Sequence, residues 1–187
     1  SALENQNFTT ATASYNVAVG YKAGEAITTG VQNVFVGGLA GDALTDADFN
    51  VAVGFSALTT DTLGSKSTAI GINSLGSQNF TTAADSFNTA VGYNAGTAIT
   101  TGDSNTLIGG LAGDALTTGT DNVAIGKDAL TSDTLGSKTV AIGKNTLEAQ
   151  NFTTATDANN VAIGDSAGQA LTTGVNNTLI GGLAGDA

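Results

Sequence analysis

The sequence repeats one five-residue pattern, Asn-Val-Ala-Val-Gly with conservative variants, along its whole length. In the first set, copies begin at 17-residue intervals at Asn16, Asn33, Asn50 and Ser67. A longer interval of 21 residues then leads to Asn88, where the set of four begins again, so that Asn16, Asn88 and Asn160 are 72 residues apart. A repeat this short can bury its apolar residues only against its neighbours. The sequence therefore predicts a stack of near-identical coils, whose function lies on an extended surface.

Within a repeat, apolar and small residues alternate. Val17 and Val19 flank Ala18, and Gly20 follows. Alternation over a few residues that ends at glycine predicts a short strand, and we expect two strands and two turns in each 17-residue coil. The chain has no proline, which suits strands that must donate hydrogen bonds along the stack. We therefore expect an all-β fold, a parallel β-solenoid or β-roll of 17- and 21-residue coils.

The array is expected to occupy residues 1–187 as a single unit. Residues 1–15 align with the end of a long coil, 16–87 and 88–159 are two super-repeats, and 160–187 begin a third. Neither end shows the polar capping unit that a free-standing solenoid needs. This favours an excised segment or a subunit that stacks head to tail.

The asparagine that begins most coils is a candidate structural residue. In-register stacking places equivalent residues about 4.8 Å apart, a spacing at which side-chain amides can bond to one another. We expect each asparagine to pair with its neighbour's amide in ladders made by Asn16, Asn33, Asn50, Asn88, Asn105, Asn122, Asn160 and Asn177.

The position two residues after that asparagine is alanine in most coils, which indicates close packing. Larger residues occupy it in the second coil of each set, namely Phe35, Leu107 and Leu179. Three residues further on, those coils have Gly38, Gly110 and Gly182. Two interpretations stay open: the glycine makes room for the large residue, or it supplies a turn conformation.

Composition excludes several functions. The net charge of -11, with five lysines and no arginine, argues against a nucleic-acid partner. The absence of His and Cys removes imidazole and thiolate metal sites and His-based or Cys-based catalysis. Carboxylates alone remain, and a solvated acidic surface explains them better. We expect no enzyme activity and no cofactor, and no apolar run is long enough for membrane insertion.

The four extra residues of the long coil predict a loop that protrudes once every four coils, over 76–87 and 148–159. Evenly spaced loops on a rod suit multivalent attachment. The candidate surface-binding residues are Asn79, Phe80 and Thr81, with Asn151, Phe152 and Thr153 in the second copy. A loop that relieves twist or seals neighbouring subunits is the alternative.

Adjacent threonines recur, as at Thr28-Thr29 and Thr100-Thr101. Flat ranks of threonine on a solenoid are typical of ice-binding surfaces. Here the pairs are adjacent, so alternation turns their side chains to opposite faces, and several pairs precede a turn glycine. Turn formation is the preferred explanation, with ice binding kept as an alternative.

The repeat resembles two families. Asn-Val-Ala-Ile-Gly at 122–126, followed by Ala129-Leu130, is similar to the head repeat of trimeric autotransporter adhesins. Asn-Thr-Ala-Val-Gly-Tyr-Asn-Ala-Gly from Asn88, followed by Thr-Thr-Gly and Asn-Thr-Leu-Ile-Gly, looks even more like repeats of bacteriophage tail-fibre proteins. The first resemblance implies a trimeric left-handed parallel β-roll, and the second a fibrous virion part that reaches the host. The coils here are longer than those of adhesin heads.

We accordingly expect a structural shaft or host-contact segment of an extracellular fibre, on a virion or a bacterial cell surface. The expected partner is the chain itself, as a homotrimer or as a head-to-tail filament, together with a host-surface receptor or glycan. A self-assembling filament subunit is the second hypothesis, and an ice-binding solenoid is the third.

Overall fold

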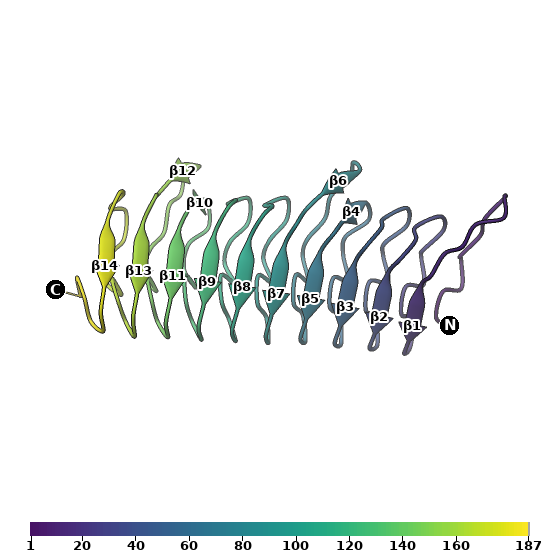
Figure 1. Cartoon of the computed structure of the whole chain (residues 1–187), viewed down its shortest axis with the longest axis horizontal. Coiled ribbons are helices and arrows are strands. Elements are labelled where there is room, and N and C mark those ends of the chain that lie inside the picture. Colours follow the sequence, from purple (N-terminus) through teal and green to yellow (C-terminus); the bar gives the residue numbers. More distant parts are fainter. Residues whose placement is uncertain (187) are drawn as a thin grey trace.

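The computed structural model describes residues 1–186. Within that range the chain winds into coils that stack along one axis to form a rod (Figure 1). It contains strands, turns and no helix, so no segment of residues 1–186 forms a helix that could cross a membrane. The expected all-β parallel solenoid of 17- and 21-residue coils is confirmed.

One strand from each coil contributes to a ten-stranded parallel sheet that runs the length of the rod. Each strand pairs in register with its equivalent one coil on, as Val51 pairs with Thr68 and Val53 with Ile70. In sheet order the strands are β1 (Val17–Val19), β2 (Val34–Val36), β3 (Val51–Val53), β5 (Thr68–Ile70), β7 (Thr89–Val91), β8 (Thr106–Ile108), β9 (Val123–Ile125), β11 (Val140–Ile142), β13 (Val161–Ile163) and β14 (Thr178–Ile180).

A second strand forms only in the third and fourth coils of each complete set, which corrects the expectation of two strands in every coil. Two-residue strands pair there, β4 (Gly64–Ser65) with β6 (Ala84–Asp85) and β10 (Gly136–Ser137) with β12 (Thr156–Asp157). Elsewhere in residues 1–186 that side is irregular and is held by hydrogen bonds between coils, such as Thr28 N–H to the Thr45 carbonyl at 2.9 Å. In each pair one strand lies in the 21-residue coil, whose extra residues supply the partner for the strand in the 17-residue coil before it.

A column of glycines allows consecutive coils to approach each other. Gly54 has φ near 138°, a conformation open to glycine, and a Cβ there would overlap the carbonyl oxygen of Gly71 in the next coil. The same obstruction recurs in this column from Gly20 to Gly164. The coil spacing therefore depends on the absence of a side chain at this corner.

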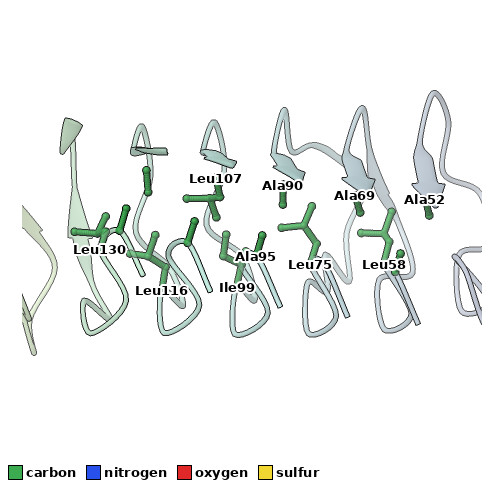
Figure 2. Packing of buried hydrophobic residues seen from close by; sticks show 14 of the residues in the cluster. Ala52, Leu58, Ala69, Leu75, Ala90, Ala95, Ile99, Leu107, Leu116 and Leu130 are labelled. Atoms are coloured by element: carbon green, nitrogen blue, oxygen red, sulfur yellow. The ribbon is translucent and has the colours of Figure 1, made fainter. Parts of the chain in front are cut away.

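The core is one narrow cluster, mostly of Ala and Leu side chains, that follows the axis (Figure 2). Large and small residues alternate across it, so that Ala52 and Ala69 accompany Leu58 and Leu75. Where the strand carries Phe35, the facing positions are glycine, and a Cβ at either Gly24 or Gly41 would overlap its ring. The same holds in the two coils where leucine takes the place of alanine at this position. Leu107 lies between Gly96 and Gly113, and Leu179 lies between Gly168 and Gly185.

These contacts correct the role expected for Gly38 and its equivalents. A Cβ at Gly38 would lie 3.4 Å from the ring of Phe55, and Gly38 makes no room for Phe35. Its φ is outside the left-handed region, so the turn explanation also fails. A Cβ at Gly110 or Gly182 would meet still less, with no atom within 4 Å at Gly110 and one at 3.8 Å at Gly182.

We predict that Gly54→Ala destabilises the fold by about 2–3 kcal/mol, because the new Cβ meets backbone in a strained conformation. Gly110→Ala is the matched control, since an added Cβ there has no atom within 4 Å. Thermal and denaturant unfolding would measure both. Equal stability of the two variants would contradict the role of the glycine column.

Candidate functional site

The outward side of the ten-stranded sheet is lined mainly by apolar residues. Each strand turns its middle residue into the core and its first and third residues outward, as Ala52 is buried between the half-buried Val51 and Val53. Across the ten strands, 16 of the 20 outward residues are Val or Ile and the other four are Thr. We call these 20 residues the outer sheet face.

Two rows of side chains flank the outer sheet face, one residue per coil. The residue before the coil's opening position forms the N-side row: Tyr15, Gln32, Phe49, Lys66, Phe87, Ser104, Asp121, Lys138, Asn159 and Asn176. The second residue after the strand forms the C-side row: Tyr21, Gly38, Phe55, Ile72, Tyr93, Gly110, Lys127, Lys144, Asp165 and Gly182. Within these two rows, aromatic residues occur only in the first five coils, and most of the charged residues lie in the later ones.

The asparagines do form a column, but most of their bonds are to backbone. Asn16 Oδ1 accepts the backbone N–H of Asn33 at 2.8 Å, and Asn16 Nδ2 donates to the Gly30 carbonyl at 2.8 Å. This pattern recurs at Asn33, Asn50, Asn88, Asn105, Asn122 and Asn160, and Asn177 ends the series. Within residues 1–186, direct bonds between the side-chain amides of two column asparagines join only three pairs: Asn33 to Asn16, Asn105 to Asn88, and Asn177 to Asn160.

A buried polar cluster interrupts the apolar core at each long coil. Asp61 is fully buried, and its Oδ1 accepts the N–H groups of Gly64 and Phe80 at 3.0 and 2.9 Å. Gln78 Nε2 donates to Asp61 Oδ2 at 2.6 Å and to Ser67 Oγ at 2.8 Å. The Asp61 carboxylate thus accepts from Gly64, Phe80 and Gln78, and these buried donors find their acceptors within the cluster.

The second super-repeat has the same cluster, made by Asp133 and Gln150. In both copies the glutamine also accepts from the next asparagine, Gln78 from Asn88 at 2.9 Å and Gln150 from Asn160 at 2.8 Å. The cluster therefore bridges the place where Ser67 or Thr139 interrupts the asparagine column. Sequence reasoning missed it, although column alignment would have found Asp61 and Gln78 at the position of Ile27 and Leu44.

The long coils rise above the others at β6 and β12 (Figure 1). Their exposed tips are residues 81–83 and 153–155, which include Thr81 and Thr153. Asn79 and Asn151 are half-buried, and their Oδ1 atoms accept hydroxyl bonds from Thr62 and Thr134.

Phe80 and Phe152 are 9% and 5% exposed. The expectation that they are surface-binding residues was wrong, because each packs inward as the anchor of its loop. A Cβ at Gly64 would lie 2.9 Å from the Phe80 ring, which shows how closely that ring approaches the neighbouring coil.

The threonine hydroxyls are largely used within the stack. Thr28 Oγ1 donates to the Thr45 carbonyl at 3.2 Å, and Thr100 Oγ1 donates to the Thr117 carbonyl at the same distance. Thr29 donates to Asp46. These bonds tie one coil to the next and leave fewer free hydroxyls for ordered water.

Charged groups lie singly or in surface pairs. Burial raises the pKa of Asp114, against a hydrogen bond from Thr131 that lowers it. The Asp157 carboxylate raises the pKa of Lys138, Glu25 raises that of Lys22, and the terminal amine lowers that of Glu4. No three His, Cys, Asp or Glu side chains in residues 1–186 gather as a metal site.

No family profile matches the sequence, and no curated protein or solved structure is similar enough to count as a match. The surfaces of this chain, and above all the outer sheet face, are therefore the features from which a function is inferred.

We predict that Asp61→Ala destabilises the chain by about 3 kcal/mol, because the donors of Gly64, Gln78 and Phe80 lose their shared acceptor. The exposed Asp165→Ala is the control, with an expected change below about 0.5 kcal/mol. Chemical denaturation measures the difference, and an Asp61→Ala variant as stable as the parent would show that the cluster is dispensable.

Proposed function

We propose that this chain is a structural, non-catalytic segment of an extracellular fibre, a shaft or host-contact region in which copies of the chain lie side by side. The observation that carries the proposal is the outer sheet face, with its 16 Val and Ile residues in ten adjacent strands. Monomeric soluble proteins seldom expose a continuous apolar surface of this extent.

The exposure of individual residues supports the same conclusion. Ile70, Ile108 and Ile163 are 37–38% exposed, although a neighbouring strand pairs with each side of the strand that carries them. Such a face is stabilised by removal from water, at about 25 cal/mol for each Å² buried. Copies of the same chain supply an apolar face of the same length and period, and a ring around an axis parallel to the rod covers every face. A homotrimer is the arrangement we favour.

The rod also suits a host-contact role. Its long-coil tips, 81–83 and 153–155, repeat every four coils, or roughly every 19 Å at the strand spacing. Each tip presents two threonines and an alanine to solvent. A receptor or glycan bound at one tip would be held near the next, which is the geometry that favours multivalent attachment.

The ice-binding alternative has less support. The hydroxyls of Thr28 and Thr100 donate to carbonyls in the following coil, so they are not a free, flat array. The filament alternative stays distinct, because end-to-end stacking would leave the outer sheet face uncovered.

We predict that Ile108→Lys, at the centre of the outer sheet face on β8, converts assembled chains into single ones while the solenoid stays folded. A lysine buried between copies would lose its hydration, whereas on a single chain it is exposed. Light scattering gives the native mass, and circular dichroism checks the fold.

Thr154→Lys adds the same charge at an exposed loop tip, away from the sheet, and is expected to keep the parent's mass. A parent chain that is itself monomeric at all concentrations would contradict the proposed function. So would an Ile108→Lys variant of unchanged mass.

A further inference from the structure

The aromatic residues of the N-side and C-side rows occur in matched pairs, with both members in the same coil. Counted from the coil that contains β1, the first, third and fifth coils carry the pairs Tyr15 and Tyr21, Phe49 and Phe55, and Phe87 and Tyr93. All six rings are at least half exposed. The two rows thus hold all three tyrosines of the chain and three of its seven phenylalanines.

The match between the rows is not explained by contact within one chain, because the members of a pair lie at opposite ends of a strand. The residues from Asn50 to Gly54, which separate Phe49 from Phe55, span roughly 13 Å at the rise of a strand. The ring centres of an interacting aromatic pair lie about 4.5–7 Å apart. Both rings stay largely in water in the single chain.

Equivalent coils of successive super-repeats show that the two row positions change together. From the earlier coil to its equivalent, the pairs change from Phe49 and Phe55 to Asp121 and Lys127, and from Phe87 and Tyr93 to Asn159 and Asp165. In the first case two aromatic residues become opposite charges, and in the second they become two polar groups that can hydrogen-bond. Positions that change together are expected to be in contact.

The second coil of each set shows the same dependence through what it keeps. There the N-side row has a polar residue and the C-side row has glycine in all three copies: Gln32 with Gly38, Ser104 with Gly110, and Asn176 with Gly182. No aromatic residue of either row occurs without an aromatic residue in the other row of the same coil.

A ring of copies brings the two positions together. Rotation about an axis parallel to the rod keeps equal coils level. The edge of the outer sheet face that carries the N-side row then meets the edge of the next copy that carries the C-side row. This geometry rests on the proposed function, because copies must cover the outer sheet face. Each N-side residue then lies beside the C-side residue of the same coil in its neighbour.

The charged residues of the seventh coil have partners within their own chain as well. The carboxylates of Asp157 and, less strongly, Asp121 raise the pKa of Lys138, and Lys127 binds Asp128. The opposite signs of Asp121 and Lys127 suit a level arrangement. The exposed rings of the first five coils have more to gain from assembly.

One level pair, in the eighth coil, has like charges. Lys138 would lie beside Lys144 of the next copy, but Lys138 is bound to Asp157 of its own chain at 2.5 Å. That carboxylate offsets the positive charge that Lys144 meets.

We propose that each copy meets the next along a level seam, in which the N-side row contacts the C-side row of the same coil and the three aromatic pairs hold the two copies together. The occupant of the outer sheet face is a second copy of this chain, parallel and unshifted. Assembly then depends more on the first five coils than on the later ones.

Tyrosine crosslinking tests the seam on the unmodified protein. Ruthenium-sensitised photo-oxidation removes one electron and one proton from each of two tyrosines, and the two rings join through a carbon–carbon bond while persulfate is reduced to sulfate. Natural and heavy-nitrogen-labelled chains are refolded together, so that a linked peptide with one light and one heavy arm comes from two copies. The expected mixed link joins Tyr15 to Tyr21, while Tyr93, which faces Phe87, stays unlinked.

Two matched variants test whether the seam is level. Phe87→Tyr should add a mixed link at Tyr93. Phe49→Tyr makes the same substitution in the same row, but it lies two coils, roughly 9.6 Å, from both Tyr21 and Tyr93, and it should add none. A mixed link from position 49 to either tyrosine would overturn the level arrangement.

The outcomes separate the seam from the proposed function. Assembled protein without a mixed link between Tyr15 and Tyr21 would overturn the seam and leave the proposed function in place. A chain that light scattering finds monomeric would overturn both.

Exchange of one aromatic pair for charges provides an independent readout. Phe49→Asp introduces the residue found at Asp121, whose backbone has nearly the same φ, 58° against 61°, so the solenoid should stay folded. The concentration of half-dissociation should rise by about tenfold, because an aromatic contact is lost and a carboxylate loses its hydration. Adding Phe55→Lys recreates the pair of the seventh coil and should return it to within about threefold of the parent.

The control adds the same lysine elsewhere in the C-side row. Gly110→Lys, combined with Phe49→Asp, lies three coils from position 49 and has room for a side chain, since no atom lies within 4 Å of an added Cβ. It should leave assembly weak. Equal recovery with either lysine would show a general effect of charge and would contradict the pairing.

Discussion

Backbone hydrogen bonds between consecutive coils are the interaction on which the rest of this structure depends. A backbone N–H in one strand donates to the carbonyl of the residue that precedes its counterpart in the next coil, as Val51 N–H does to the Ser67 carbonyl at 2.9 Å. Two side-chain requirements follow from that spacing. Gly54 and its equivalents must have no side chain at one corner. The side chains of Asn50 and its equivalents must bind backbone groups, here the N–H of Ser67 and the carbonyl of Gly64. In the short coils, both the glycine and the asparagine therefore recur every 17 residues.

Close stacking also explains why the outer sheet face is exposed and apolar. A coil of this length encloses one file of core residues, mostly Ala and Leu, so its strand has an outer face that its own chain cannot cover. β-Branched residues there suit the pleated sheet, yet they leave Val and Ile in water. In the proposed assembly, further copies would cover that face and give a short-coiled solenoid a second core.

Much of the fold could be predicted because each coil position recurs, so that repetition itself reveals the stack, the strands and the asparagine column. The predictions that failed needed the direction of a side chain within the coil. The protruding loop predicts a surface position for Phe80, but the ring turns inward as an anchor. Space for Phe35 comes from Gly24 in the preceding coil and from Gly41 in its own coil. Asp61 was missed because acidic residues are usually solvated.

Mass per unit length, measured by small-angle scattering and by electron microscopy of unstained particles, tests the central claim most directly. Ten stacked strands span about 43 Å at the usual strand spacing. Copies that cover one another's outer sheet face would give two or more chains in each such length, and three for the favoured homotrimer. A value of one chain per length, in short rods or in long filaments, would show that the outer sheet face stays in water and would contradict the account.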